Sequence, residues 1–126
     1  MGVAYGLGWA IAIVLVIVGV YAILAPHSLA RRYGVSIEGH SAAGFVRATG
    51  IRDVAFGAIL AATAYFHLFW LLVVVAVAGI AVSAADLWIA WHHGHPRRLH
   101  SAHAIHASGI VAFILIVAMA LFAIGR

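Results

Sequence analysis

GFVRATGIRDVAFG, residues 44–57, places Arg47, Arg52 and Asp53 in the first turns of an otherwise apolar helix. An ionised side chain at membrane depth costs several kcal/mol on most scales, so such side chains usually face the protein interior and pair with one another. The stretch therefore predicts a polar site inside a membrane protein. It does not name the molecule on which that site acts.

The composition of the whole chain supports a membrane location. Apolar residues make up 67% of the 126 positions and charged residues 8%, against about 45–50% and about 25% in soluble domains. This length accommodates four membrane spans of about 20 residues each and leaves no room for a soluble domain. We therefore expect an integral membrane protein that consists of a single domain, residues 1–126.

Cysteine usage and charge restrict the chemistry and the partners. The chain has no cysteine, which excludes disulfides, thiolate nucleophiles and cysteine-ligated metal sites. Its formal charge of +4 comes from arginine alone. In so apolar a protein this charge indicates contact with anionic membrane lipids rather than with nucleic acid, because there is no soluble basic face.

The apolar runs predict an all-α fold, an integral membrane four-helix bundle with spans at about 5–25, 42–64, 69–91 and 101–124. Pro26 ends the first span. Residues 26–35 then form either a short interfacial helix, with Arg31 and Arg32 against lipid phosphate, or a solvated basic loop. Residues 65–68 form a tight hairpin between the second and third spans.

Small residues mark the second span as central to the bundle. Gly50 and Gly57 are seven residues apart, and alanines recur at the same interval. Small residues let helix backbones approach closely inside a bilayer. On a helical wheel Asp53 falls within about 60° of both glycines, so we expect the aspartate on the packed face.

The order of the spans brings the polar groups together. The second span begins on the side of the membrane where the third ends and the fourth begins. That half of the bundle therefore contains Arg47, Arg52, Asp53, Asp86, His93, His100, His103 and His106. Six arginines lie on this side and one on the other, so the positive-inside rule makes it cytoplasmic. We expect a multi-pass protein of the cell (inner) membrane with both termini extracytoplasmic.

These features resemble a known kind of protein. The pattern comprises Pro26, Leu29-Ala30 and Tyr33-Gly34-Val35, then Arg47-x-x-Gly-Ile-Arg-Asp53-x-x-x-Gly57, and finally Asp86 with a histidine early in the last helix. It is similar to a family of small four-helix membrane proteins of unknown function, which are similar in layout to the DoxX-like membrane proteins. The resemblance implies a four-helix fold and no activity. Among His100, His103 and His106, we favour His103 as the histidine of that pattern.

One hypothesis for the polar cluster is acid/base chemistry on a lipophilic small molecule that enters from the membrane. Asp53 beside Arg52 and Arg47 is then the base, and Asp86 or His103 the acid. Arg47, with Arg31 and Arg32 nearer the surface, contacts the substrate or lipid head groups. An isomerase, cyclase or hydratase reaction of this kind needs no cofactor, in keeping with the absence of a nucleotide motif.

Three alternatives stay open from the sequence. The Arg/Asp network serves only to fix helix packing in a structural membrane protein, as buried polar networks do in some proteins. Alternatively, histidines bind a metal, with His100, His103, His106 and Asp86 as zinc ligands, or hold haem between helices. Lastly, intramembrane Asp and His relay protons or ions, for which four short spans would have to form a homo-oligomer.

The orientation can be tested independently of function. A topology reporter fused after Arg126 should be extracytoplasmic, and one inserted at Gly94 should be cytoplasmic. The reason is that arginine-rich segments stay on the cytoplasmic side of the membrane. Reporter activity in the reverse pattern would place the polar half of the protein at the outer leaflet.

Overall fold

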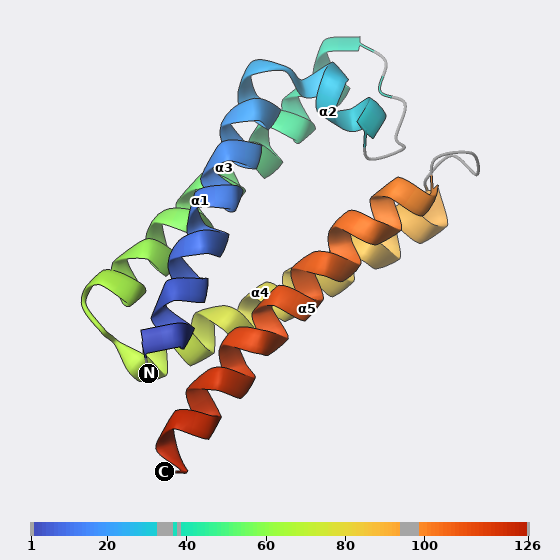
Figure 1. The fold of residues 1–126 in the computed structure, drawn as a ribbon. Helices are drawn as coiled ribbons and strands as arrows, with labels where there is room; N and C mark the ends of the chain where they lie inside the picture. The colour runs from blue at the N-terminus through green and yellow to red at the C-terminus, as the bar shows by residue number, and fades with distance from the viewer. Residues whose placement is uncertain (1, 33–36, 38, 94–98, 126) are drawn as a thin grey trace.

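The computed structural model describes residues 2–32, 37, 39–93 and 99–125, and for residues 39–41, 93 and 99–102 it describes the backbone only. The described chain is all-α, as predicted (Figure 1). Its five helices are α1 (Gly2–Leu24), α2 (Pro26–Arg32), α3 (Gly39–Tyr65), α4 (Phe69–His93) and α5 (Leu99–Ile124). The short helix α2 agrees with the helical alternative for residues 26–32. Residues 33–35 lie outside the described residues, and a position of α2 at the membrane interface stays a prediction.

Three helices are long and apolar enough to cross a membrane. They lie at Gly2–Leu24, Phe69–His92 and His103–Ile124, and they indicate a membrane protein. Helix α3 has 27 residues and is long enough, but Arg47, Arg52 and Asp53 make it less apolar. Of the four expected spans, three are therefore supported by length and composition.

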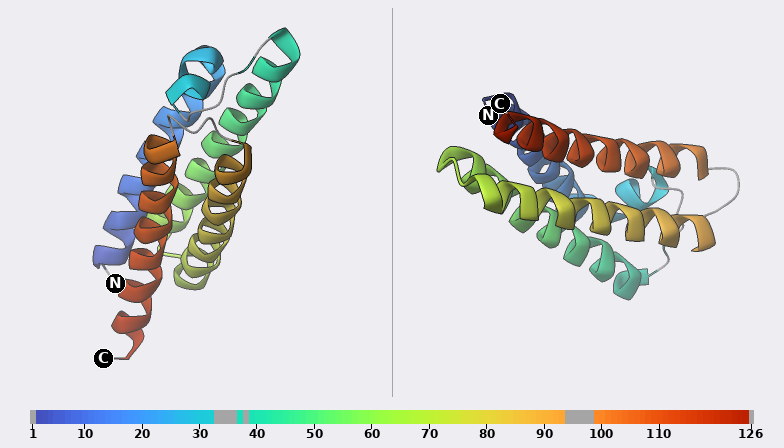
Figure 2. Two further views of the ribbon diagram at one scale, coloured as in Figure 1. Left: turned by 90° about the vertical axis from the view of Figure 1, so that its right-hand side faces the viewer. Right: turned by 90° about the horizontal axis from the view of Figure 1, so that it is seen from below.

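The four long helices form two antiparallel pairs. Helix α1 packs along α3, with α2 against both, and α4 packs along α5. The pairs lie close together at the end with the α3–α4 turn and diverge toward the end with α2 (Figures 1 and 2). Contacts between the pairs are fewer than contacts within each pair. The result is a wedge-shaped molecule rather than an evenly packed bundle.

Glycines bring the backbones of α1 and α3 into direct contact. A methyl group at Gly50 would lie 2.6 Å from the carbonyl oxygen of Gly19, and one at Gly19 would lie 2.6 Å from the carbonyl oxygen of Gly50. A methyl group at Gly57 would lie 2.9 Å from the carbonyl oxygen of Ala12. This close approach agrees with the central position expected for the second span from its small residues.

A tight turn joins α3 to α4 and holds the start of α1. The backbone N–H of Leu68 donates to the carbonyl of Thr63 at 2.9 Å, and His67 adopts a positive φ of 54°. The hydroxyl of Tyr5 donates to the carbonyl of His67 at 2.9 Å, and the two rings meet edge to face. The hairpin predicted at residues 65–68 is thus present, with α1 attached to it.

The apolar core occupies the half of the molecule near this turn. It is built from residues of all four long helices: Ala4, Ala12, Leu60, Leu72, Val75, Ala76, Phe113, Ile116 and Ala120. Phe113 of α5 lies against Gly79 of α4, where a methyl group would come within 2.6 Å of its ring. The two pairs are therefore packed solidly at one end only.

Substitution of glycines in α3 tests the α1–α3 contact. At an exposed helix position Gly→Ala stabilises by about 1 kcal/mol, and we expect this gain for Gly44→Ala, since nothing lies within 4 Å of its added methyl group. Gly50→Ala should instead lower the unfolding temperature in detergent, because its methyl group meets backbone atoms. Gly57→Leu should also lower the unfolding temperature, because overpacking of this kind reduces the free energy of unfolding by about 1–3 kcal/mol or more.

The comparison within one helix separates packing from helix propensity. An unfolding temperature that rose equally for Gly44→Ala and Gly50→Ala would contradict the backbone contact between Gly50 and Gly19.

Candidate functional site

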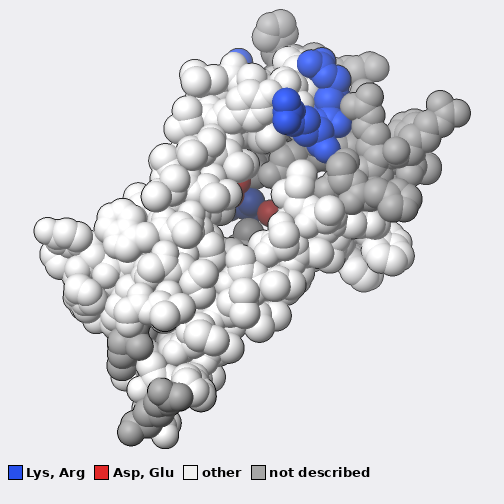
Figure 3. Space-filling model, in the orientation of Figure 1, with Lys and Arg blue, Asp and Glu red and all other residues white. Residues whose placement is uncertain are grey.

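A cavity of about 820 Å³ lies between the two helix pairs, in the half where they diverge. Figure 3 shows its hollow on the face of the molecule, with charged side chains deep inside. Its walls are mostly apolar and come from all five helices, and they include Val14, Leu15, Val18, Leu29, Phe45, Phe56, Ile89, Ile105 and Phe113. A concave, apolar site with a few convergent polar groups is typical of small-molecule binding sites.

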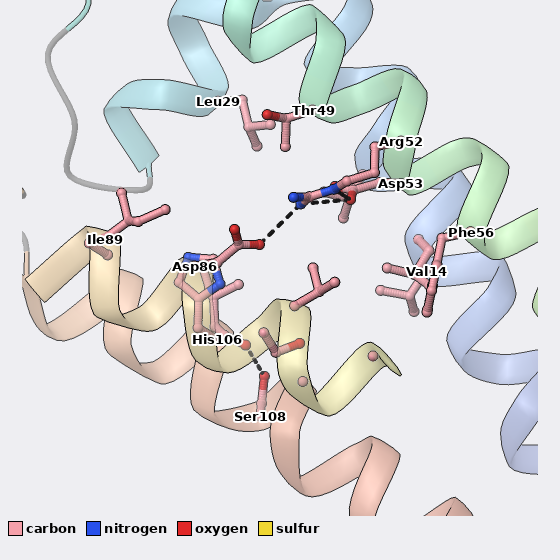
Figure 4. Close-up of a pocket in the computed structure, with 18 of the residues that line it drawn as sticks. Val14, Leu29, Thr49, Arg52, Asp53, Phe56, Asp86, Ile89, His106 and Ser108 are labelled. Carbon is pink, nitrogen blue, oxygen red and sulfur yellow. Dashed lines mark hydrogen bonds and ion pairs between the residues drawn. The ribbon is translucent and has the colours of Figure 1, made fainter. Parts of the chain in front are cut away.

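Arg52 joins two aspartates on the wall of this cavity. Its Nη2 lies 3.2 Å from Oδ1 of Asp53 and 3.1 Å from Oδ2 of Asp86, and its Nε lies 3.3 Å from Oδ1 of Asp53 (Figure 4). The side chain of Arg52 is 43% exposed, that of Asp53 19% and that of Asp86 26%. The three charged groups thus form one partly enclosed cluster, which we call the Arg52 cluster.

The Arg52 cluster connects the two helix pairs. Arg52 and Asp53 belong to α3, and Asp86 belongs to α4. The ion pair between Arg52 and Asp86 therefore crosses from one pair to the other. The sequence prediction that these three residues meet in one half of the bundle agrees with this geometry.

The Arg52 cluster contains two carboxyl groups and one guanidinium. With both carboxyl groups ionised, its formal charge is −1. Asp53 contacts Arg52 through Oδ1 and Asp86 contacts it through Oδ2. A carboxylate accepts hydrogen bonds at both of its oxygens, so the second oxygen of each aspartate can also accept from a donor.

His106 of α5, rather than His103, lies at the cavity. Figure 4 shows the ring of His106 beside Asp86, and His106 lines the cavity. His103 packs its ring against Trp91, with ring centroids 5.2 Å apart, and its Nε2 is buried without a hydrogen-bond partner among the described residues. The side chain of His100 lies outside the described residues. In this geometry the acid role proposed for His103 fits His106 better.

The described histidines do not gather into a metal site. Among the side chains that the structure describes, no group of three His, Cys, Asp or Glu able to hold a metal ion occurs. Asp86 and His106 share the cavity, whereas His103 contacts Trp91. Zinc binding through Asp86 and these histidines stays a prediction.

The other arginines have different surroundings. The Nε of Arg47 donates to the carbonyl of Ile23 at 3.3 Å, so Arg47 binds a carbonyl that has no partner within the last turn of α1. Asp53 is therefore paired with Arg52, and Arg47 stabilises a helix end. Arg31 and Arg32 are exposed in the last turn of α2, and the guanidinium carbon of Arg32 lies 5.9 Å from the centroid of the Tyr21 ring. Their proposed contact with lipid head groups stays a prediction.

Small polar residues complete the cavity wall and were missed from the sequence. Thr49, Ser83 and Ser108 all line it. Ser108 donates to the carbonyl of Ile105 at 2.7 Å and Thr49 to the carbonyl of Phe45 at 3.1 Å. Ser83 was recognisable in principle, because it lies three residues before Asp86 and hence on the same face of α4.

The family assignment covers the Arg52 cluster and almost the whole of the cavity wall. Residues 12–121 match the family described as "Domain of unknown function (DUF4267)", a range that includes the Arg52 cluster and His106. No curated protein and no solved structure matches the chain. Because the family match extends over most of the 126 residues, this membrane protein belongs to the DUF4267 family.

Proposed function

We propose that this membrane protein binds an amphipathic, lipid-like small molecule in the cavity between its helix pairs. The observation that carries the proposal is the position of the Arg52 cluster, on the wall of an 820 Å³ cavity that is otherwise mostly apolar. An ion-pair network that served packing alone would be enclosed by side chains on every side. A molecule with a polar head and an apolar body matches this distribution of groups.

The proposal places the cavity within the membrane. Helix α3 then crosses the bilayer with α1, α4 and α5 as the fourth helix of a DoxX-like layout, with both termini extracytoplasmic and the cavity in the cytoplasmic half. In support, Arg52 and Asp53 face the cavity inside the molecule. Charged side chains in membrane spans usually face the protein interior or a cavity rather than the lipid. The hollow lies between α1 and α5, both of them apolar (Figures 1 and 3), which suits entry of the ligand from the bilayer.

The polar groups suit acid/base chemistry on such a ligand. Asp53 or Asp86 would accept a proton from the ligand, and His106 would donate one, since general acid/base catalysis requires groups within hydrogen-bond reach of the reacting atoms. Arg52 would position both carboxylates and attract a developing negative charge. Isomerisation, cyclisation and hydration of a lipophilic substrate need only such proton transfers, so the proposal requires no cofactor.

One observation favours a second candidate, a purely structural role. The ion pair from Arg52 to Asp86 connects α3 with α4 across the cavity, so the Arg52 cluster also fixes the distance between the two helix pairs. Under this alternative the cavity is a consequence of the splayed arrangement and holds only lipid chains.

Filling the cavity should abolish ligand binding. Val14 lines the cavity, and Val14→Trp would place an indole ring inside it. Native mass spectrometry of the protein released from non-ionic detergent, after incubation with 1-dodecanol, dodecylamine or dodecanoic acid, should show a bound molecule for the wild type and none for Val14→Trp.

A matched change on the same helix controls for the new tryptophan. Val20 is exposed and does not line the cavity, so Val20→Trp should bind as the wild type does. If none of the three probes binds the wild type, or if Val14→Trp binds them unchanged, the ligand proposal is wrong.

Replacement of the whole Arg52 cluster distinguishes the two candidates. Arg52→Met alone leaves two carboxylates facing each other, and it should destabilise the protein by less than the roughly 3–5 kcal/mol found for fully buried pairs, because these groups are partly exposed. The triple variant Arg52→Met, Asp53→Leu, Asp86→Leu should be at least as stable as the wild type, since apolar replacement of an ion cluster is often neutral or stabilising.

Thermal unfolding in detergent provides the measurement. A triple variant that unfolds at or above the wild-type temperature means that the cluster is not needed for stability, which contradicts a purely structural role. A triple variant no more stable than Arg52→Met would favour the structural role.

A further inference from the structure

We infer that the cavity selects an amphiphile whose polar head is a protonated amine. The inference rests on the proposed function, because it names the ligand class of the same cavity. It follows from the charge of the Arg52 cluster, from the geometry of its carboxylates and from the remaining groups on the cavity wall.

The charge of the cluster requires a balancing cation. With Arg52, Asp53 and Asp86 ionised, the wall carries a formal charge of −1 next to apolar surfaces. Charge that is enclosed among apolar groups is costly unless it is paired and hydrogen-bonded. Arg52 is the only Lys or Arg among the described residues that line the cavity. The other basic group on the wall is His106, beside Asp86. We take it as a neutral imidazole, which can still act as an N–H donor, so the balancing charge comes from the ligand.

The geometry provides acceptors for an ammonium group. One nitrogen of Arg52 lies 3.2 Å from Asp53 and 3.1 Å from Asp86, which holds the two carboxylates side by side. Each contacts Arg52 through one oxygen, and its second oxygen can accept from a further donor. An ammonium has three N–H donors and no acceptor. An amine on the side of the carboxylates away from Arg52 can therefore donate to both, in charge-assisted hydrogen bonds.

The rest of the wall argues against other head groups. A carboxylate or phosphate would approach two aspartates, and like charges brought together select against a ligand. A hydroxyl head would donate only one hydrogen bond and would leave the charge unbalanced. The apolar body of an amine would lie along Val14 and Phe56, which Figure 4 shows next to the cluster.

Three probes with the same twelve-carbon chain test the inference. Dodecylamine, 1-dodecanol and dodecanoic acid differ only in the head group, and at pH 7 the first is cationic and the last anionic. We expect the Kd of dodecylamine to be lower than that of 1-dodecanol by about tenfold or more, as charge-assisted hydrogen bonds suggest, and dodecanoic acid to bind most weakly. Thermal shift and native mass spectrometry of the wild-type protein in non-ionic detergent measure the order.

Substitution of one aspartate should change the order of the probes. Asp86→Asn keeps the size of the side chain but removes the excess charge. It should therefore raise the Kd of dodecylamine by about tenfold and leave the Kd of 1-dodecanol nearly unchanged. Asp86→Glu keeps the charge and should keep the preference for the amine. If Asp86→Asn does not fold, Asp53→Asn provides the same test, because it also removes one negative charge from the cluster.

The outcomes separate this inference from the proposed function. If 1-dodecanol or dodecanoic acid binds as tightly as dodecylamine and Val14→Trp still abolishes binding, the cavity is a ligand site and the amine inference is wrong. An amine preference that survives both Asp86→Asn and Asp53→Asn would also overturn it. If no probe binds the wild type, both the proposed function and the inference fail.

Discussion

The guanidinium of Arg52 holds one carboxylate from its own helix and one from the opposite helix pair, and the arrangement around the cavity depends on this contact. The two pairs are joined by an apolar core at one end and diverge toward the other. Between those ends the ion pair with Asp86 sets how far apart α3 and α4 lie. Because charged groups resist enclosure among apolar side chains, the same contact keeps the space around it from being filled by the core.

The rigidity of the α1–α3 pair determines where that contact can form. Gly19 and Gly50 place the two backbones against each other, so α3 cannot rotate without losing this fit. Arg47 adds a further restraint, since it binds the last turn of α1 through the carbonyl of Ile23. Two arginines five residues apart on one helix thus have separate roles: Arg47 stabilises a helix end and Arg52 faces the cavity.

The sequence was sufficient for the parts of the structure that depend on local patterns. Hydropathy and length predicted the long helices to within a few residues and the hairpin at 65–68. The seven-residue spacing of small residues predicted the packing of Gly50 and Gly57. The sequence did not predict how α5 is rotated about its axis, because that helix is apolar on most of its surface. For this reason His103 was favoured, whereas His106 lines the cavity. The cavity itself depends on the angle between two helix pairs, and no local pattern specifies such an angle. The pairing of Asp53 with Arg52 rather than with Arg47 depends likewise on how α1 ends beside α3.

Phe113 belongs both to the apolar core and to the lining of the cavity, with its ring against Gly79. It therefore forms the boundary between the packed half of the molecule and the open half. For a ligand held with its polar end at the Arg52 cluster, the size of the residues at positions 79 and 113 would decide how long an alkyl chain can be accommodated. Under the proposed function, selection for chain length would then reside on α4 and α5 at the base of the cavity, apart from the charged residues proposed to bind the head group. A protein built on this plan could change one specificity while it retained the other.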